Sequence, residues 1–196
     1  MYELFFKLQE ELAPVLLSGD VAGCENTVTT RLKELPHSPF HIVLNLSITN
    51  FPEEIASHFD GFFNKEKERF RIAAAYTEMN GFDINPDRWF FDVFAYEKYG
   101  GHNDYDWLSD WQSHYYPDMT LTGLEALQEV YADDASGAVD LNDARSLAGL
   151  LVVIKFQDLI CRAAPHMRGL QFPLLATAHD HDFIFEVRRD SVQRRR

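Results

Sequence analysis

Residues 88 to 97, with the sequence RWFFDVFAYE, restrict the possible folds of the chain more than any other stretch. Side chains alternate between the two faces of an extended strand, and here both faces are largely apolar. One face carries Trp89, Phe91, Val93 and Ala95. The other carries Phe90, Asp92, Phe94 and Tyr96, of which only the aspartate is charged. A strand with two apolar faces is typical of a sheet interior, so the sequence predicts that this strand lies centrally in a sheet.

Periodic patterns predict the remaining elements. Leucines that recur every four residues from Leu4 to Leu16 indicate an amphipathic helix, and alternation from Phe40 to Ile48 indicates a strand. The expected helices span residues 2–17, 22–35, 51–64 and 140–164, with a further helix after Thr122. The other expected strands span residues 39–48, 69–79, 172–178 and 183–189, the last two forming a hairpin.

These elements predict an α+β fold with a single domain, in which a central mixed or antiparallel sheet of about five strands packs with about five helices. We expect residues 1–187 to form this domain and the arginine-rich residues 188–196 to form a basic tail. A helix at 51–64 between strands 39–48 and 69–79 would allow those two strands to pair in parallel.

Two spacings indicate where helices begin. Asn50 with Glu53, and Thr122 with Glu125, are separated as an N-cap residue is from the third helical residue. The charged run from Lys65 to Arg69 favours a solvated connection over a binding motif.

The net charge argues against one class of partner. The chain carries −13 overall, and because residues 188–196 contribute +4, residues 1–187 sum to −17. Such an acidic surface repels phosphate backbones, so we expect no nucleic-acid binding and favour a basic partner.

Cysteine usage and the N-terminal residues bear on the compartment. Cys24 and Cys161 form no CxxC pattern, which favours a reducing, cytoplasmic location with both thiols structural. The first 17 residues include three glutamates and lack a basic leading region, so they do not fit a signal peptide. No apolar run reaches the length of a membrane span, and we expect no membrane association.

Residues 83–118 combine large aromatic rings with carboxylates. The segment holds all three tryptophans of the chain, and its eight acidic and two basic residues give it a net charge of −6. Beyond Gly100 the pattern predicts a long loop or short helical turns. This loop is either pinned by its rings as part of the fold or is a surface that binds a basic partner. The predicted partner-binding residues are Asp104, Tyr105, Asp106, Trp107, Asp110, Trp111, Tyr115 and Tyr116.

Two short patterns resemble metal sites. His179 and His181 would point the same way on a strand, and neutral imidazole suits zinc or iron. The other interpretation is a polar hairpin turn, because no further motif supplies a third ligand. Residues 104–110 resemble a calcium loop but lack the glycine and the glutamate that such a loop requires. The favoured interpretation has no metal and no cofactor.

Catalytic patterns are scarce. Asp92 lies among aromatic residues, where burial would raise its pKa and suit it to proton transfer. Its alternative role is a carboxylate at the sheet rim or one paired with Arg71 or Arg88. The sequence has no phosphate-binding loop and no GxGxxG pattern. No nucleophile-elbow context surrounds the neighbouring residues Ser109, Ser113 and His114.

The run MNGFDINPDRWFFDVFAYEKYGGHNDYDWLSDWQS, about a fifth of the chain, resembles a motif of a family of uncharacterised bacterial proteins. In size and charge the chain also resembles the acidic immunity proteins that are encoded beside secreted bacterial toxins. That resemblance implies a cytoplasmic protein that binds a cognate toxin and occludes its active site. The leading hypothesis is therefore a non-enzymatic immunity protein. The alternatives are a metal-dependent enzyme that uses His179 and His181, and a structural or regulatory subunit that docks through its N-terminal helix.

Overall fold

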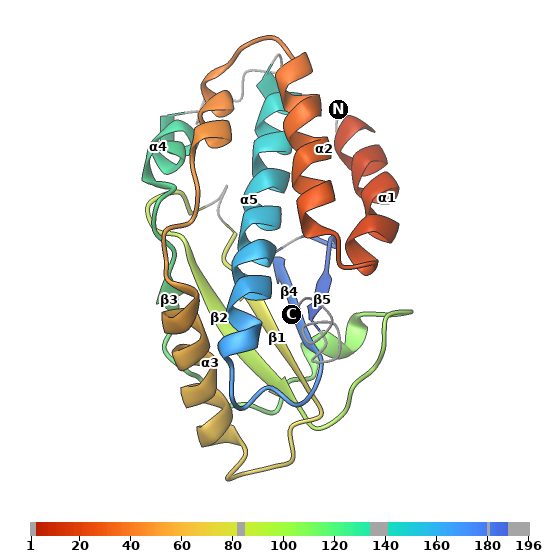
Figure 1. Ribbon diagram of the computed structural model, residues 1–196, viewed down its shortest axis with the longest axis vertical. Coiled ribbons are helices and arrows are strands. Elements are labelled where there is room, and N and C mark those ends of the chain that lie inside the picture. The colour runs from red at the N-terminus through yellow and green to blue at the C-terminus, as the bar shows by residue number, and fades with distance from the viewer. Residues whose placement is uncertain (1–2, 82–84, 134–140, 180, 188–196) are drawn as a thin grey trace.

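A mixed sheet lies at the centre of the computed structural model, which describes residues 3–81, 85–133, 141–179 and 181–187 (Figure 1). Among these residues five strands pair in the order β3-β2-β1-β4-β5. The strands are β1 Ala74–Met79, β2 Phe90–Tyr96, β3 Met119–Thr120, β4 Leu174–Ala178 and β5 Phe185–Val187. The α-helices are α1 Glu3–Leu17, α2 Val21–Glu34, α3 Pro52–Glu66, α4 Glu125–Asp133 and α5 Asn142–Ala163. Short 3₁₀ helices are η1 Pro39–Asn45, η2 Asp106–Ser109 and η4 Ala164–His166. The predicted α+β class is confirmed.

Strand pairing explains why the sheet is mixed. β1 pairs antiparallel with β2, so that Glu78 lies opposite Asp92, and it pairs in parallel with β4 on its other side. The predicted hairpin of β4 and β5 is confirmed as an antiparallel pair. β1 is the middle strand, and β2 lies between it and the two-residue β3. The interior position predicted for residues 88–97 therefore holds.

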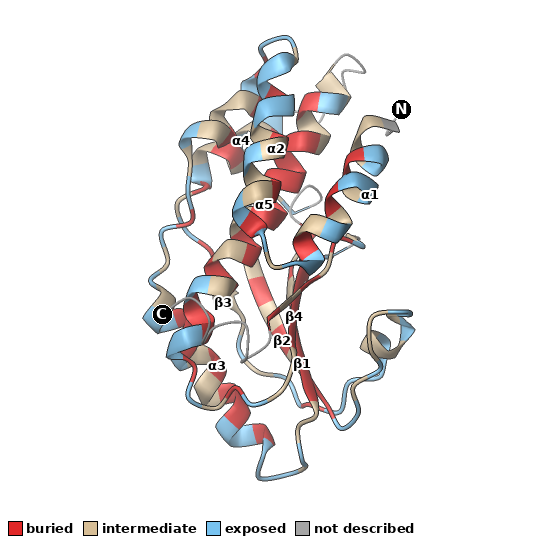
Figure 2. Cartoon of the chain, turned by 45° about the vertical axis from the view of Figure 1, so that its right-hand side comes forward, coloured by how far each residue is buried: buried red, intermediate tan, exposed pale blue. Residues whose placement is uncertain are grey.

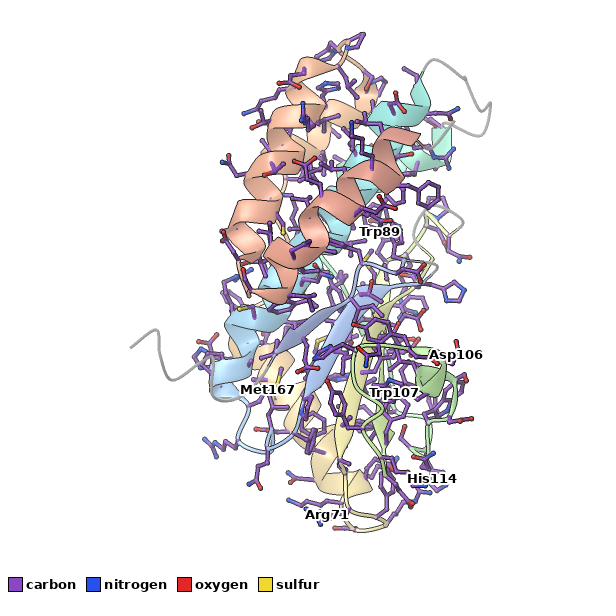
Figure 3. All side chains as sticks on the ribbon, turned by 90° about the vertical axis from the view of Figure 1, so that its right-hand side faces the viewer. Arg71, Trp89, Asp106, Trp107, His114 and Met167 are labelled. Atoms are coloured by element: carbon purple, nitrogen blue, oxygen red, sulfur yellow. The ribbon has the colours of Figure 1, made fainter. Side chains whose placement is uncertain are left out.

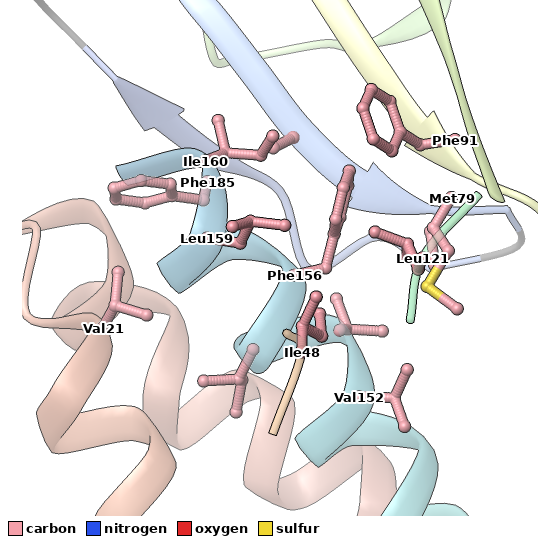
Figure 4. Close-up of a cluster of buried hydrophobic side chains, with 14 of the residues drawn as sticks. Val21, Ile48, Met79, Phe91, Leu121, Val152, Phe156, Leu159, Ile160 and Phe185 are labelled. Carbon is pink, nitrogen blue, oxygen red and sulfur yellow. The ribbon is translucent and has the colours of Figure 1, made fainter. Parts of the chain in front are cut away.

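Helix α5 covers one face of the sheet and forms the centre of the main core (Figure 1). All eight residues from 147 to 154 are buried, as expected for a helix that other elements surround. Phe156 packs its ring 5.4 Å from that of Phe91 on β2 (Figure 4). Buried Gln157 donates from Nε2 to the carbonyl oxygens of Ala176 and Phe183, which ties the helix to the sheet. Helices α2 and α3 pack on further sides of α5.

The second face of the sheet carries a separate, smaller apolar cluster. Its buried members are Ala74, Tyr76, Tyr96 and Leu175. No helix longer than the four-residue η2 lies on this cluster among the described residues. It is covered instead by partly buried side chains of the segment that follows β2, including Tyr99 and Trp107. The apolar second face of β2 thus requires a covering loop.

The strand predicted for residues 39–48 is wrong, because residues 39–45 form the 3₁₀ helix η1. Pro39 lies in its first turn, and the backbone N–H of Ser38 donates to Nδ1 of His41. Phe40 and Val43 are buried three residues apart, which is the 3₁₀ period rather than the period of a strand. The parallel pair of 39–48 with 69–79 does not form, and β1 begins only at Ala74.

Both predicted N-caps also differ from the structure. Phe51 is the N-cap residue of α3, and the Asn50 side chain instead bonds Thr120 O and Thr122 N. The carboxylate of Glu125 accepts from the backbone N–H of Gly123, so the predicted box with Thr122 is absent. Several predicted features lie outside the described residues: the helix start at Asp140, the first residue of the 2–17 helix, the last two residues of the 183–189 strand, and the 188–196 tail.

We expect replacement of Phe156 by alanine to destabilise the protein by about 3 to 5 kcal/mol, because it leaves a cavity between α5 and the sheet. Denaturant unfolding followed by circular dichroism measures this free energy. The matched control is Phe51→Ala, since Phe51 is 65% exposed, and it should change stability by about 0.5 kcal/mol or less. Equal effects of the two variants would contradict the assigned core.

Candidate functional site

The segment from residue 99 to 118, here called the acidic–aromatic loop, crosses the second face of the sheet. The Trp107 ring lies 4.9 Å from the Tyr96 ring, and its Nε1 donates to Gly101 O at 3.2 Å. The Tyr96 hydroxyl in turn donates to Leu108 O at 2.8 Å. A Cβ on Gly100 would lie only 2.2 Å from the Trp107 ring, so a glycine is required there. Trp107 therefore holds the loop on the sheet.

The loop then runs beside β2 and forms hydrogen bonds with its last residues. Ala95 donates its N–H to Ser113 Oγ at 3.0 Å, and Gln112 donates its N–H to Ala95 O at 3.1 Å. Glu97 N donates to the Gln112 side chain at 2.9 Å. These bonds satisfy backbone groups that would otherwise be unpaired at the edge of the sheet. They fix the position of the loop between its two ends.

A buried carboxylate at the end of α3 forms the next anchor. Glu66 is 0% exposed, and it accepts hydrogen bonds from the His114 backbone N–H and from the Arg69 guanidinium. Arg69 also donates to Gln112 O at 3.3 Å. The sequence interpretation of residues 65–69 as a solvated connection is therefore wrong for Glu66, whereas Arg69 is exposed although it pairs with Glu66. The alternating charges of this run gave no signal that one carboxylate was buried.

Tyr116 anchors the far end of the loop. Its ring lies 5.4 Å from Phe62 and 5.0 Å from His58, both on α3, and the Lys65 ammonium lies 5.7 Å above it. A Cβ on Gly61 would lie 2.5 Å from the Tyr116 hydroxyl oxygen, so the ring fits against a glycine. Tyr116 thus couples the loop to the main core.

The eight predicted partner-binding residues divide into two groups. Tyr105, Trp107 and Tyr116 pack against the two apolar clusters and hold the loop in place. Trp111 and Tyr115 are 51% and 77% exposed, although the Trp111 ring also contacts Phe94 at 5.1 Å. The remaining members are three exposed aspartates, Asp104, Asp106 and Asp110. No ion pair engages these aspartates within the described part of the chain.

The five exposed residues define the acidic–aromatic surface: Asp104, Asp106, Asp110, Trp111 and Tyr115. In Figure 3 Asp106 lies at the outer edge of the molecule, whereas Trp107 lies nearer to the strands of the sheet. Figure 2 shows the η2 region in the colours of intermediate and exposed residues, beside the buried strands. Carboxylates and rings therefore face solvent on a segment whose backbone is held by four contacts to the fold: Trp107, the Ser113 region, Glu66 and Tyr116.

The two histidines of the alternative metal site have different neighbours. His179 Nδ1 lies 2.8 Å from Glu78 Oε1 on β1, and the His179 side chain is 58% exposed. The His181 ring instead lies edge-on to Phe5 of α1, at 5.8 Å. Asp180 between them lies outside the described residues. Among the residues that the structure describes, no three histidine, cysteine or acidic side chains are placed to hold a metal ion, and this includes residues 104–110.

Asp92 has a raised pKa, chiefly because burial disfavours its charged form and secondly because Asp118 and Glu78 add negative charge nearby. Arg88 opposes this shift, but its guanidinium forms its ion pair with Asp118 rather than with Asp92. The sequence-based alternative of a direct pair with Arg88 is therefore wrong. Asp92 lies opposite Glu78, which places carboxylates on adjacent strands.

The serine and histidine candidates are used by the fold. Ser109 Oγ donates to Asp106 O, and Ser113 Oγ accepts from Ala95 N. The backbone of His114 contacts Glu66. These contacts place no serine hydroxyl on a histidine ring in the described loop.

Comparison with protein-family models, curated proteins and solved structures finds no match to this chain. Function must therefore be argued from the geometry of its own residues. Within the described residues, no helix combines the length and the apolar character that crossing a membrane requires.

We expect Glu66→Ala to release the loop and to lower the unfolding free energy by about 2 to 3 kcal/mol, because hydrogen bonds to a charged group are lost. Hydrogen exchange should show faster exchange of the amides of residues 112–116. Glu68→Ala is the control, because Glu68 is an exposed neighbour. Unchanged protection of 112–116 in Glu66→Ala would rule out the anchor.

We expect stability to fall as the pH drops through the ordinary histidine pKa of 6.5, because burial lowers the pKa of His58 in the folded state while Asp118 opposes the shift. The unfolded chain then binds more protons than the folded chain, and protonation favours unfolding. His58→Phe keeps a ring against Phe91 and Tyr116 and should weaken this dependence. Unfolding free energies from pH 7.5 to 5 measure it, with exposed His166→Gln as the control. An unchanged pH profile in His58→Phe would refute this role.

Proposed function

We propose that this chain is a non-enzymatic binding protein whose acidic–aromatic surface binds a basic protein partner. The observation that carries the proposal is the exposure of Trp111 and Tyr115 beside three aspartates that have no ion-pair partner within the described residues. The Trp111 ring contacts Phe94 at 5.1 Å on one side and still leaves 51% of the residue exposed to solvent.

The fixed backbone of the loop favours tight binding. Ordering a mobile loop on association costs free energy, and here the fold has already ordered it through Trp107, Glu66 and Tyr116. Tryptophan and tyrosine supply large contact areas at low entropic cost and are common binding hot spots. The geometry therefore supports a prearranged contact surface.

The charge of the surface favours a basic partner. Carboxylates that face solvent speed the capture of a cationic surface and oppose binding to acidic ones. The same sign prevails over the chain as a whole, which carries −13. Long-range attraction and local contacts thus select the same kind of partner.

We further propose that the partner is a bacterial toxin and that the chain is its cytoplasmic immunity protein. In this mechanism Asp104, Asp106 and Asp110 occupy the basic active site of a nuclease or nucleotide-dependent toxin, while Trp111 and Tyr115 anchor the complex. Occlusion of that site blocks substrate access without any catalytic step by this chain. The support is the match between an acidic, aromatic surface and a phosphate-binding site, together with the resemblance described above.

The metal-dependent enzyme remains the alternative. His179 and His181 contact Glu78 and Phe5 respectively, and these separate neighbours give the alternative less support than the loop gives to binding. Metal analysis of protein purified without a tag or chelator separates the two proposals, because a stoichiometric metal would favour the enzyme.

We expect reversal of Asp104, Asp106 and Asp110 to lysine to abolish partner capture. The wild type and this variant serve as bait in lysate of the native host, and retained proteins are quantified by mass spectrometry. A single protein should bind the wild type and be retained at least ~30-fold less by the variant, which corresponds to the loss of about 2 kcal/mol.

The matched control reverses Glu10, Glu11 and Glu129, three exposed residues on α1 and α4, and changes the net charge by the same amount. It should retain the partner like the wild type. Equal losses in both variants would mean that net charge alone causes capture, and no specific protein on the wild type would refute the proposed function. Identification of the captured protein as a toxin, and protection of cells against it by the wild type alone, tests the immunity role.

A further inference from the structure

A groove of about 1230 Å³ opens beside α3, and it includes none of the proposed partner-binding residues and neither histidine of the predicted metal site. Three segments line it: one side of α3, residues 67–72 and residues 166–172. The last two are separated by almost a hundred residues in sequence, and the fold brings them together at one end of the molecule. Arg71 marks this end in Figure 3.

Three residues with cationic side chains line this groove: Lys67, Arg71 and Arg168. None of them forms an ion pair within the described part of the chain, although the Lys67 ammonium donates a hydrogen bond to the Asn64 side chain. The chain has 18 lysine and arginine residues against 31 acidic residues, so three cations that line one groove are unexpected from the overall charge.

Two carboxylates, Glu53 and Asp60, also line the groove and offset part of this positive charge, but neither forms an ion pair with Lys67, Arg71 or Arg168. Asp60 accepts the backbone N–H groups of Arg168 and Gly169 at 3.0 and 2.8 Å, so both of its oxygens hold the 168–169 turn. Glu53 lies 3.7 Å from the His166 ring. Asp60 therefore acts as a support that positions Arg168, and the guanidinium groups remain available to a ligand.

The side chains of residues 65–71 make contacts in two different places. Glu66 and Arg69 contact the acidic–aromatic loop, whereas Lys67 and Arg71 line the groove. Phe70 and Phe172, both partly buried, add apolar surface to the same groove, and Phe172 packs edge-on against Phe63 at 5.0 Å. The groove thus offers cationic groups beside apolar rings.

We propose that this groove binds an organic phosphate with a ring-bearing apolar body. A guanidinium group can donate two parallel hydrogen bonds to two oxygens of one phosphate. A phosphate monoester carries a charge of about −1.5 to −2 at neutral pH, so it matches a site with three cations better than a ligand with one carboxylate would. Arg71, Arg168 and Lys67 hold the phosphate, and the apolar body lies on Phe70 and Phe172. The volume exceeds that of most drug-sized sites, so it admits a ligand as large as a nucleotide.

The net negative charge of the chain does not prevent this binding. Charges more than about 8 Å away are screened at physiological salt, so the field that a bound phosphate experiences is set mainly by the groove itself, where three cations outnumber two carboxylates. Binding of this kind is independent of the partner-binding proposal, because the two surfaces share none of their ligand-contacting residues.

Amide NMR of the full chain tests the proposal, with phenyl phosphate, adenosine monophosphate and inorganic phosphate as probes. Phenyl phosphate should give saturable shifts in the amides of residues 60–72 and 166–172, and adenosine monophosphate should bind at the same residues. Inorganic phosphate should bind at least ~5-fold more weakly, because it makes no apolar contact (about 1 kcal/mol). Equal affinity for inorganic phosphate, or shifts that do not saturate, would overturn the proposal.

Charge-matched variants test the residues. Arg71→Gln with Arg168→Gln should weaken phenyl phosphate binding at least ~10-fold, whereas Arg31→Gln with Arg162→Gln, which removes two exposed arginines outside the groove, should leave it within ~2-fold. Lys67→Gln alone should give an intermediate loss and guards against misfolding of the double variant. Equal binding by the two double variants would overturn the assignment of the groove.

Discussion

The sheet of this protein has two apolar faces, and both must be kept from water. Helix α5 covers one face with an almost continuous buried surface between residues 147 and 160. The other face has no such helix among the described residues and is covered by aromatic side chains of the acidic–aromatic loop, chiefly Trp107 over Tyr96. Burial of these rings contributes favourable free energy in proportion to the apolar area removed from water. The position of the loop therefore follows from the composition of β2.

This arrangement gives one segment two roles. The rings that point inward stabilise the fold, and the backbone they hold presents Asp104, Asp106 and Trp111 to solvent. A loop fixed in this way can bind a partner without first being ordered, which is why the structural and the binding interpretation of its aromatic residues are compatible. Glu66 joins the two roles, since its buried carboxylate connects α3 to the backbone of residue 114.

Charge is distributed unevenly over the folded chain. The acidic–aromatic surface is anionic, whereas the groove beside α3 gathers Lys67, Arg71 and Arg168. Residues 65–71 contact both parts of the molecule, because neighbouring side chains here face in different directions. Glu66 holds the backbone of the acidic–aromatic loop, whereas Lys67 and Arg71 line the groove. The proposed partner and the proposed phosphate ligand thus have opposite charges and would bind at different places on the same molecule.

Residue patterns alone predict the α+β class, the amphipathic α1, the interior position of β2 and the β4–β5 hairpin, because each follows from periodic burial of apolar side chains. The apolar alternation of residues 39–48 predicted a strand, which is wrong. Pro39 and the contact of His41 with Ser38 favour a 3₁₀ helix there. The sequence pattern also identified the loop residues. It could not show that Trp107 packs on the sheet while Trp111 is exposed, because the residue type does not reveal which side chain points inward. The different exposure of these two rings, the burial of Glu66 and the groove all depend on contacts between residues far apart in the chain, so they become visible only in the folded protein.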